Sequence, residues 1–242
     1  MRRIFVPRSR IEADVARLLP PELHYLKDVL RLPAGAAIEV FDGEGAAYGG
    51  VLELPGLVRL GPRRDVPAPR ARVHLAFALA RGDRADLVVQ KATELGAVRL
   101  SPFEAARSVV HLDAERGAER ARRWRRIAEE ASRQCGRADV PQVDAPAPLR
   151  DLLAATPARF VKLLLYEGGG DPIGAAVDRA APGHLAIVGP EGGLAPEEVE
   201  AALGAGARLV TLGPRVLRFE TAAITATALL QHLAGDLGAP EL

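Results

Sequence analysis

Two glycine-containing loops in the last quarter of the chain carry the side chains best suited to chemistry. The first, Gly189-Pro-Glu-Gly-Gly193, has glycines that let a ligand approach the backbone and tolerate positive φ, and Glu191 is its one ionisable side chain. An ordinary strand-to-helix turn is the alternative explanation for this loop. The second loop places Arg215, Arg218 and Glu220 beside a run of small apolar residues. Because charges next to an apolar helix need partners, the second loop predicts a binding or catalytic site.

The residues before and after these loops predict how they are positioned. Residues 184–188 and 208–212 are short apolar runs that each stop at a glycine. A helical pattern follows each loop, at residues 196–203 and in an apolar stretch that ends near residue 233. Strand–helix units of this kind build a parallel sheet, and open α/β sheets bind ligands at the carboxyl edge of their strands. The two loops are therefore expected to meet at that edge.

The middle of the chain continues the same α/β pattern upstream. Residues 73–79 form a continuous apolar run, as expected for a strand buried on both faces, and residues 83–95 have the spacing of a helix. A strand is expected at 98–103. Another apolar run at 158–166 leads into a third loop, residues 167–170, at the same sheet edge. Asp171-Pro172 is expected to start the next helix.

A long arginine-rich helix is predicted for residues 113–134. Its charges suit either a solvated helix face with pairs four residues apart or a contact with an RNA backbone, and both interpretations stay open.

Closer to the N-terminus, Lys91 and Glu94 lie three residues apart and are expected to pair on one helix surface rather than to act in catalysis.

The first sixty residues have a different pattern, which indicates a separate domain. Alternating strands at 38–41 and 48–54 surround a turn at Asp42-Gly43, and residues 21–30 have helical spacing, so a small β-barrel with one helix is expected. His24 in that helix is interpreted as a hydrogen-bonded packing residue rather than a catalyst. Residues 61–70 hold three prolines and a glycine and are interpreted as a linker. The predicted domains are therefore 1–68 and 69–242.

The composition narrows the class of protein. Hydrophobic residues make up 48% and charged residues 26%, and the net charge is +1, so any nucleic-acid binding requires a local basic patch. A single cysteine, Cys135, excludes an internal disulfide, and no apolar run reaches the length of a membrane span. We interpret the chain as cytoplasmic. The five histidines are dispersed, so no metal site is expected, and the glycine patterns of nucleotide-binding loops and of serine hydrolases are absent.

The two C-terminal loops also resemble a known family. Gly189-Pro-Glu-Gly-Gly193 followed by Leu212-Gly-Pro-Arg-Val-Leu-Arg-Phe-Glu-Thr-Ala222 is similar to the signature of the RsmE family, the 16S ribosomal RNA (uracil(1498)-N3)-methyltransferases of the SPOUT superfamily. Upstream blocks resemble the family in the same order, so the resemblance covers nearly the whole chain: His24-Tyr-Leu-Lys-Asp-Val-Leu-Arg31, Gln90-Lys-Ala-Thr-Glu-Leu-Gly96, Arg107-Ser-Val-Val110 and Ser132-Arg-Gln-Cys-Gly-Arg137.

The resemblance implies a fold, a cofactor and partners. It implies a C-terminal α/β domain with a mostly parallel sheet and a deep trefoil knot, and a small N-terminal PUA-like β-barrel that binds RNA. It also implies S-adenosylmethionine (S-adenosyl-L-methionine) as cofactor, a part in rRNA processing and ribosome biogenesis on the small ribosomal subunit, and a homodimer. A monomer in which the last helix is a core helix is the alternative.

Site residues carried over by resemblance fall into three groups. The cofactor pocket is expected to comprise Leu165, Gly189, Glu191, Gly192, Leu212, Gly213 and Leu217. The residues expected to contact RNA are Arg8, Arg10, Lys27, Arg31, Arg107 and Arg137. The catalytic candidates are Arg218 and Glu220.

Methylation of uracil N3 requires the proton on that nitrogen to leave or the resulting anion to be stabilised. A fixed guanidinium is most effective in a water-poor site, so Arg218 is the candidate for stabilising charge on the base oxygens. Glu220 either accepts the proton or orients Arg218. Two other functions fit the same residues: a SPOUT methyltransferase acting on another RNA such as tRNA, and an RNA-binding platform without catalysis.

Overall fold

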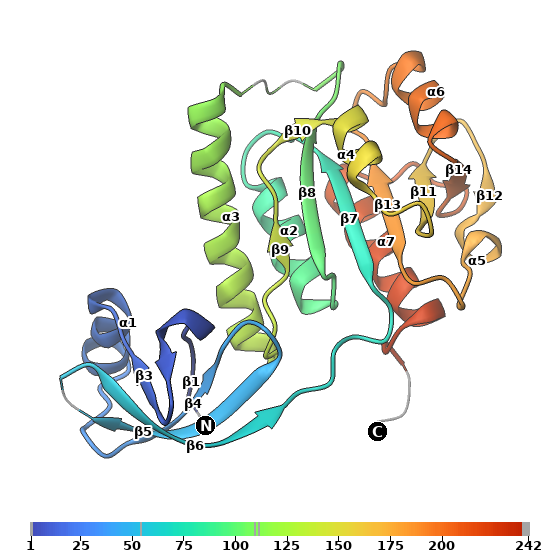
Figure 1. Cartoon of the computed structure of the whole chain (residues 1–242). Coiled ribbons are helices and arrows are strands. Elements are labelled where there is room, and N and C mark those ends of the chain that lie inside the picture. The colour runs from blue at the N-terminus through green and yellow to red at the C-terminus, as the bar shows by residue number, and fades with distance from the viewer. Residues whose placement is uncertain (1, 54, 109, 111, 239–242) are drawn as a thin grey trace. The chain divides into compact units, whose positions relative to one another are not determined.

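The computed structural model describes residues 2–53, 55–108, 110 and 112–238, and the chain forms two compact units (Figure 1). The first unit comprises Met1–Ala68 together with Glu129–Val140, and the second comprises Pro69–Ala128 together with Pro141–Leu242. The segment Glu129–Val140 thus packs with the N-terminal residues, although it belongs to the range that the sequence suggested for the second domain.

The first unit is built on a six-stranded sheet with the order β1-β4-β5-β6-β3-β2. β1 pairs with β4 in parallel, and the remaining neighbours are antiparallel. Alternate residues such as Ile38, Val40, Leu52 and Val58 are completely buried and form its core. The strands are β1 (Arg2–Phe5), β2 (Ile11–Glu12), β3 (Val15–Arg17), β4 (Ala37–Phe41), β5 (Ala46–Glu53) and β6 (Leu57–Asp65).

Two expectations for this unit need correction. β6 runs to Asp65, so the first half of the expected linker is a strand, because Val58 and Leu60 are buried and extend the alternating pattern. His24 is hydrogen-bonded as expected, with its Nδ1 2.7 Å from Asp28, but it is exposed and therefore is not a packing residue. The expected helix is present as α1 (Pro20–His24), which continues into a π-helical turn, η2 (Tyr25–Val29). Leu54, expected to end β5, lies outside the described residues.

The second unit holds an eight-stranded sheet in which all pairs are parallel. Its order is β10-β8-β7-β13-β11-β14-β12, and β9 pairs with β8. β7 and β13 lie at the centre and are buried at every position, which explains their continuous apolar sequence. The strands are β7 (Val73–Ala78), β8 (Arg99–Glu104), β9 (Gln142–Val143), β10 (Ala147–Pro148), β11 (Val161–Leu165), β12 (Asp171–Pro172), β13 (His184–Val188) and β14 (Ala207–Thr211).

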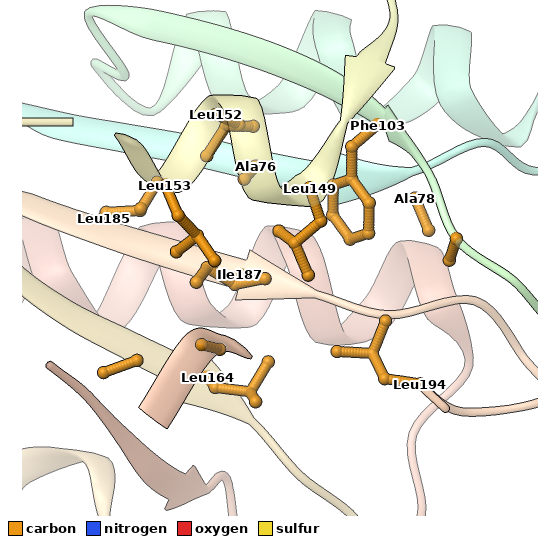
Figure 2. Packing of buried hydrophobic residues seen from close by; sticks show 13 residues of the cluster. Ala76, Ala78, Phe103, Leu149, Leu152, Leu153, Leu164, Leu185, Ile187 and Leu194 are labelled. Carbon is orange, nitrogen blue, oxygen red and sulfur yellow. The ribbon is translucent and has the colours of Figure 1, made fainter. Parts of the chain in front are cut away.

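Helices cover both faces of this sheet. Figure 2 shows Leu149, Leu152 and Leu153 of α4 (Leu149–Ala155) over Leu185 and Ile187 of β13, in a cluster that also includes Ala202 of α6 (Pro196–Gly204). Burying each such leucine stabilises the fold by about 1.5–3 kcal/mol. Phe77 alternates to the opposite face, where its ring centroid lies 6.4 Å from that of Phe219 in α7 (Phe219–Ala234).

α7 (Phe219–Ala234) packs on β7, β13 and α2 (Arg84–Glu94). On the same side, α3 (Ala114–Cys135) contacts α2 through Trp124, whose Nε1 donates to Asp86 at 2.9 Å. The expected pair on α2 is confirmed, with Lys91 Nζ 2.9 Å from Glu94. The helix expected at Asp171-Pro172 is present but begins just after these residues: they form β12, and Pro172, with a φ of −53° and a ψ of 133°, is the N-cap of α5 (Ile173–Ala176). Whether the chain path forms the trefoil knot stays a prediction.

Candidate functional site

A cavity of about 420 Å³ lies where β11, β13 and β14 end. Parallel strands bring their carboxyl ends to one edge, so the loops after these three strands all contribute to its wall. The wall combines apolar side chains, exposed backbone and a few charges. The lining residues from these loops include Leu165, Tyr166, Glu167, Gly189, Pro190, Glu191, Gly193, Leu212, Gly213, Pro214, Arg215, Val216, Leu217 and Arg218.

The loop at 189–193 is a tight turn held from outside. The backbone N–H of Gly193 donates to the carbonyl oxygen of Pro190 at 2.9 Å, and Gly193 has a φ of +70°, a conformation that favours glycine. Arg84, at the start of α2, forms an ion pair with Glu191. Arg107, just after β8, donates from Nη1 to the carbonyl oxygen of Gly192 at 3.3 Å. Two arginines from other segments therefore fix this loop.

The loop after β14 is held by a local exchange of hydrogen bonds. Thr211 Oγ1 accepts from the backbone N–H of Gly213 at 3.2 Å and donates to the Gly213 carbonyl oxygen at 3.0 Å. Arg218 then forms the N-cap of α7, and its carbonyl accepts from the Ala222 N–H at 2.8 Å. Val216 is 80% exposed at the mouth of the cavity. Among the described residues, the exposed side chains of Arg215 and Arg218 have no ion-pair partner.

The third loop, after β11, places a carboxylate at the cavity. Tyr166 N–H donates to the Val210 carbonyl oxygen at 3.0 Å, which ties the start of this loop to β14. Glu167 follows and lines the cavity. Its Oε1 lies 3.2 Å from the position that a Cβ atom on Gly193 would occupy, so the first and third loops meet at this point.

Most of the residues expected at the cofactor pocket line this one cavity: Leu165, Gly189, Glu191, Leu212, Gly213 and Leu217. Gly192 belongs to the same loop but is not among the lining residues. Arg107, expected to contact RNA, and Arg218, expected to be catalytic, also line the cavity. Their individual roles stay predictions.

Sequence reasoning missed Tyr166, Glu167 and Arg84. The position of Glu167 directly after an apolar strand and before three glycines was a usable signal, because it placed a carboxylate at the same edge as the other two loops. Arg84 had no such signal, since its partner Glu191 is 107 positions away along the chain.

Glu220 lies in the first turn of α7 but does not line the cavity. Its Oε2 atom is buried and has no hydrogen-bond partner among the described residues. No ion pair joins it to Arg218 in that part of the chain.

The arginines and lysine expected to contact RNA in the first unit differ in availability. Arg8, Lys27 and Arg31 are exposed. Arg10 is held by two bonds of 2.6 Å to the carboxylate of Glu22. The side chain of Arg137 is only 11% exposed and pairs with Asp139 at 2.6 Å.

A separate polar cluster lies at the amino ends of β7 and β8, beside a smaller cavity of about 260 Å³. His74 Nε2 lies 2.7 Å from Ser101 Oγ, and that hydroxyl donates to Asp144, which also accepts from Arg99 Nε at 2.8 Å. Burial, with a contribution from nearby Arg99, lowers the pKa of His74 to about 4. Burial likewise lowers the pKa of His184. His74 is therefore neutral at physiological pH, and it serves the fold rather than acid–base chemistry.

Within the described ranges, no three His, Cys, Asp or Glu side chains come together in a way that suits a metal ion; His111 falls outside those ranges. No described helix combines the length and apolar character that a membrane crossing requires.

Comparisons with known proteins match both units. Residues 67–231 match an RNA methyltransferase domain family, and residues 20–56 match an RNA methyltransferase PUA domain family. The chain is 35% identical over 206 residues to a protein of Mycobacterium bovis named ribosomal RNA small subunit methyltransferase E, covering 82% of this chain and 79% of that one. It is 31% identical over 252 residues to the protein of the same name from Bacillus subtilis, covering 96% of each.

Solved structures agree with these relatives. A methyltransferase from Legionella pneumophila, solved in complex with S-adenosylmethionine, superposes with a TM-score of 0.89 at 32% identity, covering 98% of this chain and 99% of that one. A ribosomal RNA small subunit methyltransferase E from Neisseria gonorrhoeae bound to S-adenosylmethionine has a TM-score of 0.87 at 30% identity, with 98% and 99% covered.

Proposed function

We propose that this chain, which belongs to the ribosomal RNA small subunit methyltransferase E family, transfers a methyl group from S-adenosylmethionine to N3 of uridine 1498 in 16S ribosomal RNA. The chain is an S-adenosylmethionine-dependent ribosomal RNA methyltransferase. The target nucleotide and the nitrogen are the proposed part. The observation that carries the proposal is the convergence of three loops, with Arg107 and Arg218, on one cavity.

The cavity fits the methyl donor in size and in chemistry. Its volume of about 420 Å³ falls within the range of roughly 300–1,000 Å³ that is usual for small-molecule sites. Leu165, Leu212 and Leu217 offer apolar surface for a flat adenine ring, and the loop backbones offer hydrogen-bonding groups for its edge. When bound, the cofactor supplies a methyl carbon that is already activated for displacement. We assign Gly189, Glu191, Gly192 and Gly213 to its backbone contacts.

The protein's own contribution is orientation and charge. Arg218 lines the cavity without an ion-pair partner among the described residues, so its guanidinium is free to donate to a base oxygen on which negative charge develops. Glu220 does not line the cavity. The target base must leave its stack before N3 can be reached.

The first unit is proposed to bind the RNA. Its match to an RNA methyltransferase PUA domain supports this role, and Arg8, Lys27 and Arg31 are exposed for phosphate contacts. Arg10 and Arg137 are already held by Glu22 and Asp139, so each would have to exchange a carboxylate for a phosphate. We further propose a cytoplasmic homodimer with the knotted path of the SPOUT superfamily.

The proposal is tested by a methylation assay with labelled S-adenosylmethionine. The RNA substrates are small ribosomal subunits that lack the modification, naked 16S RNA and bulk tRNA, and the labelled nucleoside is identified afterwards. We expect 3-methyluridine in the subunit or in its RNA. Label in tRNA would instead indicate another RNA target. No label in any RNA, together with no cofactor binding in calorimetry, would support an RNA-binding platform. Sedimentation at the mass of a single chain, 25.6 kDa, would contradict the homodimer.

A further inference from the structure

We propose that Glu167 is the group that accepts the N3 proton of the target uracil, and that Glu167 and Arg107 together select uracil over cytosine. This inference rests on the function proposed above and names the residues that perform it.

Two glutamates line the cavity, Glu167 and Glu191. Glu191 is already paired with Arg84. Glu167 has neither a hydrogen bond nor an ion pair to any other described residue. Glu220, which the sequence suggested, is absent from the lining and has a buried Oε2 atom. Among the described residues, Glu167 is therefore the unpaired carboxylate that faces the site.

Glu167 and Arg107 converge on one point although they follow different strands. A Cβ atom on Gly193 would lie 3.2 Å from Glu167 Oε1 and 3.9 Å from Arg107 Nη1. Both side chains line the cavity, one after β11 and the other after β8. Since position 193 carries no side chain, neither group is covered from that side. A carboxylate and a guanidinium thus flank the same point of the wall without forming an ion pair with each other.

This pair matches the edge of uracil that carries N3. On that edge an N–H donor lies between two carbonyl oxygens, so a carboxylate accepts from N3–H while a guanidinium donates to an adjacent oxygen. Arg218 lines the same cavity and can donate to the second oxygen. Cytosine presents a lone pair at N3 and an amino group beside it. It would therefore face the carboxylate and the guanidinium with groups of the wrong kind, which opposes binding.

The proton transfer balances with the methyl transfer. The N3 proton moves to a carboxylate oxygen of Glu167, and N3 keeps the electron pair of the broken N–H bond. That pair forms the new bond between N3 and the methyl carbon, while the carbon–sulfur bond of the methyl donor breaks with its pair left on sulfur. Glu167 later releases the proton to solvent. No further oxidant, reductant or co-reactant is required.

The test compares Glu167→Gln with Glu220→Gln and with Glu200→Gln, an exposed glutamate of α6 that lies outside the cavity lining. Single-turnover methylation is measured on subunits that carry uridine or 5-fluorouridine at the target, since fluorine makes N3–H more acidic. With uridine, E167Q should be slower by roughly 10²–10⁴-fold, the usual contribution of a positioned base. With 5-fluorouridine the deficit should shrink at least tenfold. E200Q should match the unsubstituted protein.

Two further measurements distinguish a general base, which accepts the N3 proton, from a residue with a purely structural role. Calorimetry should give all three variants an S-adenosylmethionine affinity within about twofold of the original, and circular dichroism should confirm their folding. Subunits with cytidine at the target should bind relatively better to E167Q, because the amide can donate to cytosine N3.

Several results would overturn the inference. They are an undiminished rate in E167Q, an equal deficit with both nucleosides, or rescue by fluorine in E220Q instead. If the unsubstituted protein binds the cofactor but methylates neither subunits nor 16S RNA, the proposed function fails first and the inference fails with it.

Discussion

Arg84 and Glu191 form an ion pair that joins the first residue of α2 to the middle of the 189–193 loop, 107 positions later in the chain. The contact ties a loop that lines the cavity to α2, the helix that follows β7. Both side chains are partly exposed, so the pair stabilises the fold by less than about 1 kcal/mol. The pair mainly limits the conformations of the 189–193 loop before a ligand binds.

Removing this tether is expected to weaken cofactor binding without unfolding the protein. In Arg84→Ala, calorimetry should show a loss of S-adenosylmethionine affinity of about twofold to fivefold, which corresponds to at most about 1 kcal/mol. The free energy of unfolding in urea should change by less than about 1 kcal/mol. Arg150→Ala, which removes another exposed ion pair, is the matched control and should leave affinity unchanged. An unchanged affinity in Arg84→Ala would show that the loop is rigid without the pair.

Arg218 is expected to matter for the reaction and not for cofactor binding. Loss of one preorganised donor to developing charge typically lowers a rate by about 10²–10³-fold, so Arg218→Ala should lose methylation to that extent or more while keeping its cofactor affinity. Rates are measured at saturating cofactor and affinity by calorimetry. A folded variant that instead loses cofactor binding would contradict the assigned role.

A side chain at Gly193 is expected to strain the site. An alanine there must adopt a φ of +70°, which costs about 1–2 kcal/mol, and its Cβ would press against Glu167 Oε1 at 3.2 Å. Gly193→Ala should therefore lower both the cofactor affinity and the methylation rate. Gly204→Ala is a suitable control, because the space around its Cβ position is open and its φ is not positive. Equal behaviour of the two variants would contradict the close approach of the two loops.

The buried histidines should make stability depend on pH. The pKa of His74 falls to about 4 in the folded state from an ordinary value of 6.5, so between these values the unfolded chain binds a proton that the folded chain does not. The free energy of unfolding is therefore unaffected by His74 above about pH 6.5. It decreases as the pH falls toward 4, by up to roughly 3 kcal/mol for this residue. His184 acts in the same direction. Urea unfolding between pH 4.5 and 7.5 measures the slope, and His74→Gln should reduce it. A flat profile would contradict the burial of a neutral His74.

Much of the sheet and of the cavity could be predicted from local patterns. Residues 184–188 form a strand with the expected bounds because a strand buried on both faces must be continuously apolar. The three loops meet as expected because parallel strands share one carboxyl edge. Features that depend on contacts distant in sequence escaped prediction. The return of Glu129–Val140 to the first unit rests on backbone pairing such as Gly43 N–H to Ala138 O at 3.1 Å, and no periodicity in either segment signals it.

It was harder to predict which charged side chains line the cavity than to predict where the strands and loops lie. Glu220 was a reasonable candidate because it follows Arg218 closely in sequence, yet the first turn of α7 places Arg218 in the cavity lining and leaves Glu220 outside it. Glu167 lies about fifty residues upstream of Arg218 and shares the cavity only because β11 and β14 are neighbours. Sequence proximity is thus a poor guide to which charges share a site.

The strand order also bears on how the protein is made. β7 has β8 on one side and β13 on the other, so its second neighbour is synthesised more than a hundred residues after it. While a nascent chain grows, that side of β7 presents apolar residues and unpaired backbone groups, which are hazards for association with other chains. Because contacts of long sequence separation form slowly, this interval is expected to extend beyond synthesis itself. The cavity, whose loops follow the late strands, is therefore among the last features to form.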